Sequence, residues 1–517
     1  MLGFPGSAAI AQSDPPPGDI ANIDYLGNVA QQNGVSMSGM TSINIVRYRA
    51  QDVLVAVGRF GVMTFDLADP EAPELLDHLP STDLRLEGDS AGTFWQSEST
   101  NIDQQRKLIF LSRDPRAYNH PQNSGVSGVY VVNARDPKAL ELVTFHPVPA
   151  GHTSTCINNC RYLWTGGPAV DQNMPPEWGG RPIYVTDMTD YRRPYTFPDP
   201  IDIERNDGVT DYAHDVQVDN QGVAWVSGRG PVRGYWTEGR RWDPVQQRYR
   251  TATAWDPVPY AGGIGAEAWK ATGPAVAHNS ERPVDPTSGI RRAEGLRDSE
   301  RTDVPLARDG SDYEAHGFEP GELLYVTHED FNGPCAERGR FYIVSLRDSY
   351  NGESWRSTPD NPFRLEVLSS WHPWEMEGYD PNTANCSGHY FRMRDGFVYM
   401  SWYAQGTRVL DVRDPYNPRQ VAYFRPNGGS SYTTLPYDDL VYVADSSRGV
   451  DILRLTDEAF DVADSGDEIV APRLSEAELA AFTEQYEADP IMGWSCPVHR
   501  EAQQDDHSDQ HSDHHTH

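Results

Sequence analysis

Four histidines stand at similar distances ahead of four similar apolar segments of the chain. The distances from each histidine to the Thr or Ser that ends its segment are 13, 13, 11 and 12 residues, for His152, His214, His316 and His389 respectively. Neutral imidazole nitrogens are good ligands of Fe, Cu and Zn. If the fold places these equivalent positions side by side, the four histidines form a transition-metal site.

Acidic residues near these histidines extend the predicted site. The same count in the second repeat gives Glu98 or Ser99 as the equivalent position, and a carboxylate there would complete the ligand set. Asp215 and Glu314 are expected behind the ligands, where a carboxylate accepts the second ring N–H and fixes the tautomer. The count also gives, in the last and first repeats, Tyr432 or Thr433 and a position near Asn44.

Two further clusters have residue types suited to chemistry. His328-Glu329-Asp330 predicts either an acid/base or metal site at a channel mouth, or an ordinary polar turn. Trp371-His372-Pro373-Trp374 and Trp402-Tyr403 predict either a face on which a planar or sugar ligand stacks, or aromatic packing. The chain has no G-x-S-x-G, P-loop or dinucleotide fingerprint, so it gives no support to serine hydrolase, phosphotransferase or nicotinamide chemistry.

The histidines belong to a repeated strand unit. From His389 to Tyr423 the chain reads as a strand, a turn at Asp395-Gly396, two alternating apolar strands and a stop at Asp414-Pro415. Copies of the second half of this unit start at Val53 and Leu440, and looser copies start at Gly128 and Pro182. A period of roughly 40 to 55 residues with about four short strands is typical of propeller blades. We therefore predict an all-β fold, a seven-bladed β-propeller.

In a propeller the first strand of each blade lines the central channel, so equivalent residues of successive blades become neighbours. This geometry would bring the histidines of four consecutive blades together around the axis. The alternative is that a histidine is only the residue that the repeat copied, hydrogen-bonded to the backbone of the next blade. The sequence leaves both interpretations open.

The segment from Gly406 to Pro418, G-x-R-V-L-D-V-x-D-P-x-N-P, resembles the LVIVD-type repeat of bacterial and archaeal surface proteins. That resemblance implies a β-propeller and an extracellular setting, and it implies no reaction. In outline the histidine arrangement is similar to two propeller families, the carotenoid-cleavage oxygenases with four-histidine iron and the selenium-binding or methanethiol-oxidase family with histidine-bound copper. The similarity is architectural and carries no substrate across.

Charge and cysteine content limit the function classes. The 517 residues include 43 basic and 76 acidic side chains, a formal charge of −33, which argues against nucleic-acid or anionic-membrane partners. No run of 18 apolar residues predicts a membrane span. The five cysteines lack C-x-x-C spacing, so disulfides are expected, with Cys156 and Cys160 able to close a small loop.

The chain divides into four parts. Residues 1–34 are expected to be a signal-peptide remnant and linker, although ring closure by an N-terminal strand is usual for propellers. Residues 35–457 form the propeller, and its insertion at 229–312 is either outer blade strands with a lid or a functional excursion. Residues 458–489 hold a short helix with a capping box at Ser475. Residues 490–517 hold a cysteine and a disordered, acidic, His-rich tail that binds metal weakly or is merely solvated.

Two functions from different classes follow. The first is a secreted or cell-surface propeller with Fe, Cu or Zn in its channel, acting as a metal-dependent oxidoreductase on a small organic substrate. The second is a non-catalytic surface or adhesion module whose loops bind a protein or glycan. The sequence leaves open whether the protein is an enzyme.

Overall fold

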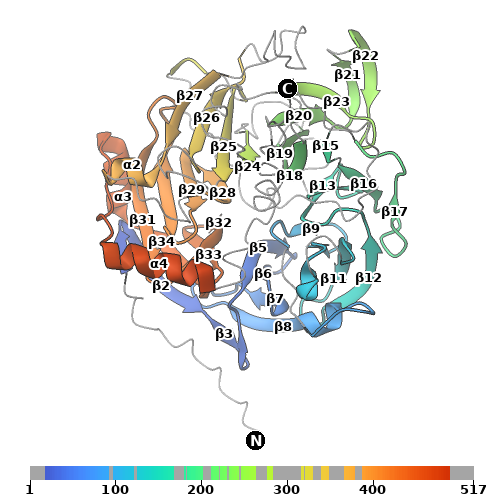
Figure 1. Ribbon diagram of the computed structural model, residues 1–517, viewed down its shortest axis with the longest axis horizontal. Coiled ribbons are helices and arrows are strands. Elements are labelled where there is room, and N and C mark those ends of the chain that lie inside the picture. The colour runs from blue at the N-terminus through green and yellow to red at the C-terminus, as the bar shows by residue number, and fades with distance from the viewer. Residues whose placement is uncertain are drawn as a thin grey trace, which may run out of the picture.

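Four-stranded antiparallel sheets follow one another around a central axis in the computed structural model (Figure 1). Counting the strand pairings gives seven blades, which confirms the predicted fold. The structure describes residues 18–91, 97–120, 125–167, 180–181, 183–201, 211–219, 222–229, 232–243, 246–262, 276–282, 316–318, 321–329, 339–347, 366–378 and 387–488.

The first three blades run in chain order, each from its innermost to its outermost strand. Blade 1 holds β5 (Met40–Arg47), β6 (Asp52–Gly58), β7 (Gly61–Asp66) and β8 (Glu74–Pro80). Blade 2 holds β9 (Asn101–Asp103), β10 (Leu108–Arg113), β11 (Gly128–Asn133) and β12 (Glu141–Pro147). Blade 3 holds β13 (Thr153–Ile157), β14 (Tyr162–Gly166), β16 (Tyr184–Asp187) and β17 (Tyr195–Thr196).

Blades 4 and 5 are joined into one larger sheet, because the second strand of blade 4 pairs with the first strand of blade 5 through Arg229 and Val276. Blade 4 holds β18 (Asp211–Val218), β19 (Val223–Arg229), β20 (Arg233–Trp236) and β23 (Val258–Gly262). Blade 5 holds β24 (Val276–Glu281), β25 (Leu323–Glu329), β26 (Phe341–Ser345) and β27 (Glu366–Trp371).

The N-terminal segment completes the last two blades. Blade 6 holds β28 (Phe391–Arg394), β29 (Phe397–Ser401), β30 (Thr407–Asp411) and β31 (Arg419–Pro426), with β1 (Gly18–Ala21) added outside. Blade 7 holds β32 (Ser431–Tyr437), β33 (Leu440–Asp445) and β34 (Gly449–Leu455), and β2 (Ile23–Val29) is its fourth strand. The assignment of residues 1–34 to a leader and linker is therefore wrong for β1 and β2, which close the ring.

Several short strands and helices are attached to this ring of blades. Small pairings involve β3 (Gln31–Gln32) with β4 (Val35–Ser36), β15 (Gly180–Arg181) with β18, and β21 (Gly239–Asp243) with β22 (Arg248–Ala252). The helical pieces are η1 (Ser81–Leu84), η2 (Ala117–Asn119), α2 (Pro373–Met376), α3 (Asp457–Ser465) and α4 (Glu476–Ala488). The predicted capping box is confirmed, since Ser475 N–H donates to Glu478 at 2.7 Å and Glu478 N–H donates to Ser475 Oγ at 3.3 Å.

The apolar core lies between the blades. In the part of the chain that the structure describes, seven clusters of buried apolar side chains each fill one gap between successive blades. Every blade therefore buries both faces, which explains near-continuous apolar strands such as Val53–Val57 and Val441–Ala444. Because each blade packs against the next, the inner strands are held at fixed positions around the axis.

Several other predictions have a structural outcome. The 229–312 insertion supplies β20, β21, β22, β23 and β24, so the part that is described consists mainly of blade strands and not of a separate excursion. Cys156 and Cys160 are joined by a disulfide, as predicted. The other three cysteines, most of the insertion beyond Arg282 and the His-rich tail lie outside the described residues. Among the helices that are described, none is long and apolar enough to cross a bilayer.

Candidate metal centre

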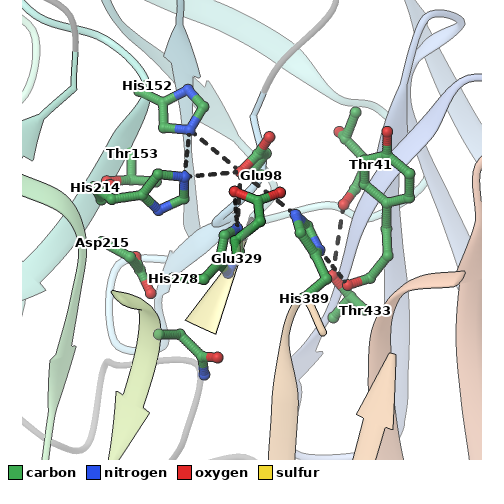
Figure 2. A network of polar contacts seen from close by, with 12 residues as sticks. Thr41, Glu98, His152, Thr153, His214, Asp215, His278, Glu329, His389 and Thr433 are labelled. Atoms are coloured by element: carbon green, nitrogen blue, oxygen red, sulfur yellow. Dashed lines mark hydrogen bonds and ion pairs between the residues drawn. The ribbon is translucent and has the colours of Figure 1, made fainter. Parts of the chain in front are cut away.

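Four histidine rings surround one carboxylate on the axis of the propeller (Figure 2). The Nε2 atoms of the four rings all lie near Oε2 of Glu98, at 3.3, 3.9, 3.7 and 3.8 Å for His152, His214, His278 and His389. The four histidines and Glu98 have no exposed surface or almost none. The residues come from blades 2 to 6, so five consecutive inner strands build one buried site.

The inner strands aim two of these histidines at the axis by means of β-bulges. The pairing of β18 with β19 skips His214, since Ala213 pairs with Gly228 and Asp215 with Ser227. The pairing of β24 with β25 skips His278 in the same way. A bulged residue is left out of the ladder and its side chain is re-aimed. The equivalent bulges of blades 1 and 7 carry Thr41 and Tyr432, and these two blades supply no histidine to the centre.

His152 stands immediately before β13 and His389 two residues before β28, and each ring has a contact at its second nitrogen. Nδ1 of His152 lies 3.4 Å from Oδ2 of Asp114, which also pairs with Arg116 at 2.5 Å. Nδ1 of His389 lies 2.7 Å from the carbonyl oxygen of Tyr432 on blade 7. A partner at Nδ1 fixes the ring orientation and directs Nε2 toward the centre. A hydrogen bond from a histidine to the backbone of the next blade was expected if the histidines were only structural. His389 makes such a bond through Nδ1, and its Nε2 still faces the centre.

A second carboxylate lies beside the first. Oε2 of Glu329, at the end of β25, is 3.9 Å from Nε2 of His278. Its other oxygen accepts a hydrogen bond from the phenol of Tyr403, a buried residue that also packs against the His389 ring. Glu329 is fully buried, so the centre contains two carboxylates that water does not solvate.

The protonation states follow from burial and these contacts. Burial raises the pKa of Glu98, but the charge and hydrogen bonding of His152 outweigh it and hold that pKa well below its usual range. Burial lowers the pKa of His152, but Glu98 and Asp114 together raise it to about 9. Burial and the neighbouring His278 lower the pKa of His389 to about 4, and burial with His278 and His152 lowers that of His214 well below normal. His214 and His389 are therefore neutral, the form that binds metals.

The donor set fits a transition metal. Both ring nitrogens of His278 and Nε2 of His389 are buried and make no hydrogen bond within the described part of the chain. Buried polar atoms in folded proteins are normally hydrogen-bonded, so the unbonded Nε2 atoms beside Glu98 indicate a missing partner. Nitrogen donors with one or two carboxylates suit Fe, Cu or Zn. The donor atoms converge closely enough to hold such an ion, since sets of three lie within 4.8 Å of one another.

A glycine makes room for His152. A Cβ on Gly167 would lie 2.1 Å from Cβ of His152, and Gly167 has φ +107°. We expect Gly167→Ala to lower the free energy of unfolding by about 1–3 kcal/mol, since it adds backbone strain and displaces the imidazole. Denaturant unfolding measures this loss. Gly27→Ala is the control, because a Cβ there meets nothing within 4 Å and φ is not positive; an equal loss in both variants would contradict the argument.

The structure brings three of the four predicted histidines together and leaves out the fourth. His152, His214 and His389 meet at the centre, with Glu98 as the predicted equivalent from blade 2. The placement of His316 was wrong. Its side chain is 36% exposed and its Nδ1 lies 3.6 Å from Asp414 of blade 6, away from the axis. The inner strand of blade 5 is β24, and its histidine is His278.

Two residues of the centre were missed by sequence reasoning. The search required a histidine close ahead of its second strand, but β24 ends at Glu281 and β25 begins only at Leu323. A local signal was available, since Ala277-His278-Asn279 matches Ala213-His214-Asp215 of the preceding blade. Asp114 had no such signal, because it follows β10 and reaches His152 only through the packing of blade 2 on blade 3.

The remaining predicted site residues have varied positions. Asp215 is buried next to His214 and accepts a hydrogen bond from Gln217 at 2.5 Å. His328 is buried on β25 and pairs across the ladder with Ala277. Glu314 lies outside the described residues. Trp371 and Trp402 pack edge to face at 5.4 Å inside the core between blades 5 and 6, which agrees with aromatic packing between strands.

Comparisons with known proteins give no family. No family model and no curated protein matches the chain. Among solved structures it is similar to the periplasmic gluconolactonase PpgL of Pseudomonas aeruginosa, with 12% identity and a TM-score of 0.41 over 80% of this chain and 88% of that one. It is also similar to the β-propeller domain of Myceliophteria thermophila Cps50 (Swd1), with 10% identity and a TM-score of 0.43 over 85% and 100%. The fold rests on the strand pairing itself, and the function must be argued from the centre.

Proposed function

We propose that this protein binds Fe, Cu or Zn on the propeller axis and, with Fe or Cu bound, acts as a redox protein on a small organic substrate. The observation that carries the proposal is the convergence of four buried Nε2 atoms on one carboxylate oxygen. Two buried carboxylates and buried nitrogens without hydrogen bonds are unfavourable together, and a bound metal ion would stabilise both. A redox metal bound there supplies one-electron exchange with substrate or oxygen.

The residues of the chain divide the remaining work. His152, His214, His278 and His389 would hold the metal, and Glu98 would neutralise part of its charge. Asp114 and the Tyr432 carbonyl orient two of the imidazoles through their Nδ1 atoms. Burial excludes bulk water, which strengthens every charge interaction in the centre. Rigid inner strands keep the donors in place, so little reorganisation is needed when the metal or its substrate binds.

Two features support an extracellular setting and a relationship to LVIVD-type repeat proteins. The segment Gly406–Pro418 carries the repeat and occupies the third strand and following turn of blade 6. The Cys156–Cys160 disulfide fits an oxidising compartment. We propose on these grounds that the protein is secreted or displayed on the cell surface.

Elemental analysis of the purified full chain tests the metal proposal. Each of the five tail histidines from His507 to His517 is first replaced by serine, so that the tail adds no metal of its own. We expect stoichiometric Fe, Cu or Zn that survives dialysis and falls in His214→Ala. His146→Ala is the matched control, because His146 is half-buried on β12 and bonds Thr196. A folded protein that holds no metal and cannot be reconstituted would return the histidines to a structural role in a binding scaffold.

A further inference from the structure

We propose that the centre holds two metal ions bridged by the carboxylate of Glu98. This inference rests on the proposed function and specifies its nuclearity. The evidence for two ions is the way in which the donor atoms are grouped. Glu98 forms one set with His152 and His214 and another with His278 and His389, and all donor atoms of a set lie within 4.8 Å of one another. Two imidazoles therefore stand on each side of one carboxylate.

The grouping favours two ions over one at the middle of the arc. A metal–nitrogen bond is about 2.1 Å long, so nitrogens on opposite sides of one ion are at most about 4.2 Å apart. Here Oε2 of Glu98 occupies the middle, 3.3 to 3.9 Å from the four nitrogens. Those distances alone fit ligands of one ion as well, but among the described residues no group of donor atoms within 4.8 Å of one another includes all four histidines. Two ions bridged by a carboxylate lie about 3.5–4 Å apart, which leaves the carboxylate in its position.

Blade order supports the same division. Nε2 of His152 and Nε2 of His214 are only 2.9 Å apart, a spacing suited to two ligands on one ion. His278 and His389 have ring centroids 4.0 Å apart and are assigned to the second pair, although the centroids of His214 and His278 are 4.2 Å apart. Figure 2 shows Glu98 between the rings of His152 and His214 on one side and that of His389 on the other.

Glu329 adds a second carboxylate between the two pairs of histidines. Its Oε2 lies 3.9 Å from Nε2 of His278, and it forms a third set of close donors with His214 and His278. Its position is fixed because Tyr403 donates a hydrogen bond to the other oxygen. Two divalent ions with Glu98 and Glu329 retain net positive charge, since Asp114 is paired with Arg116. An oxygen-donor anion, such as hydroxide or the carboxylate or alkoxide of a small substrate, is the ligand class that this charge selects.

Copper titration distinguishes two ions from one. The full chain with serine in place of the tail histidines is loaded with Cu(II), dialysed, and measured for copper content and for integrated EPR intensity. We expect two equivalents of copper, with EPR intensity per copper falling as the second equivalent binds, because carboxylate-bridged ions couple magnetically. One equivalent with full EPR intensity would overturn the two-ion inference and leave the proposed function standing. No bound copper or other metal would defeat both.

Variants of the histidines on the two sides of Glu98 provide a second test that does not depend on the copper titration of the parent chain. His152→Ala and His389→Ala should each reduce the content from two equivalents to one and restore the EPR signal of an isolated Cu(II). If a single ion is shared by all four rings, each variant should lose it instead. Glu98→Gln keeps the size of the side chain but removes the bridge, so the coupling should vanish. Retained coupling in Glu98→Gln would contradict the assignment of the bridge, and circular dichroism verifies that the variants are folded.

Discussion

His278→Ala is expected to lower the affinity of the centre for its metal by more than about 100-fold, whereas His316→Ala leaves it unchanged. Loss of an outer-shell partner alone costs about 10–100-fold, and His278 contributes a donor atom itself. Its Nε2 lies 3.7 Å from Oε2 of Glu98 and 3.9 Å from Oε2 of Glu329. His316 meets Asp414 at a partly exposed position.

Competition with a metal chelator measures the two affinities, and unfolding in denaturant verifies that both variants retain the fold. The two variants are a matched comparison, because both residues are histidines in the part of the chain that runs from blade 4 to blade 6. The sequence spacing had predicted His316 as the metal ligand. Equal losses in the two variants would mean that the axis does not hold the metal. A loss confined to His316→Ala would restore the interpretation from sequence spacing and reject the centre described above.

Removal of residues 18–29 is expected to destabilise the protein by about 3–6 kcal/mol, a large part of the typical stability of a folded domain. The estimate counts only the burial of Ile23 and Val29, which pack into the gaps beside blade 7. The deletion also removes the ladder of β2 with β34 and that of β1 with β31. The outer edges of blades 6 and 7 would then be open to pairing with another chain.

Denaturant unfolding and size-exclusion chromatography check this expectation, with lower stability and oligomers as the predicted result. Ile20→Ser is the control, since Ile20 lies on β1 but is 41% exposed, and its effect should stay within about 0.5 kcal/mol. A shortened chain that is monomeric and as stable as the parent would show that β2 is dispensable for closure.

The fold was predictable from sequence because the repeat consists of short-range sequence patterns. Strands that are buried on both faces require apolar residues, and tight turns require residues that tolerate positive φ, such as Asp395 and Gly396 at 52° and 79°. These signals are independent of distant parts of the chain. The same logic located His152, His214 and His389, because each stands close to the second strand of its own blade.

The rest of the centre is harder to find from spacing within one blade. His278 lies far in sequence from the strand with which it pairs, so a search based on spacing selected His316 instead and passed over the local match to Ala213-His214-Asp215. Glu329 was predicted as a candidate within His328-Glu329-Asp330. Asp114 was not, because it reaches His152 only through the packing of blade 2 against blade 3. Ring closure by an N-terminal strand was expected, but the residues of β1 and β2 were assigned to a linker because a strand that completes a distant blade has no partner nearby in sequence.

The position of β2 also has a consequence for biosynthesis. Ile23–Val29 pairs with Gly449–Leu455, so β2 is translated well before its partner strand. All the ligands of the candidate centre, from Glu98 to His389, are translated before that partner appears. Because domains fold as units and distant pairings form late, we expect the histidine side of the ring to be assembled while the opposite side is still open. Metal present during synthesis therefore has a lateral route into the centre, in addition to the channel of the finished ring through which the folded protein is loaded.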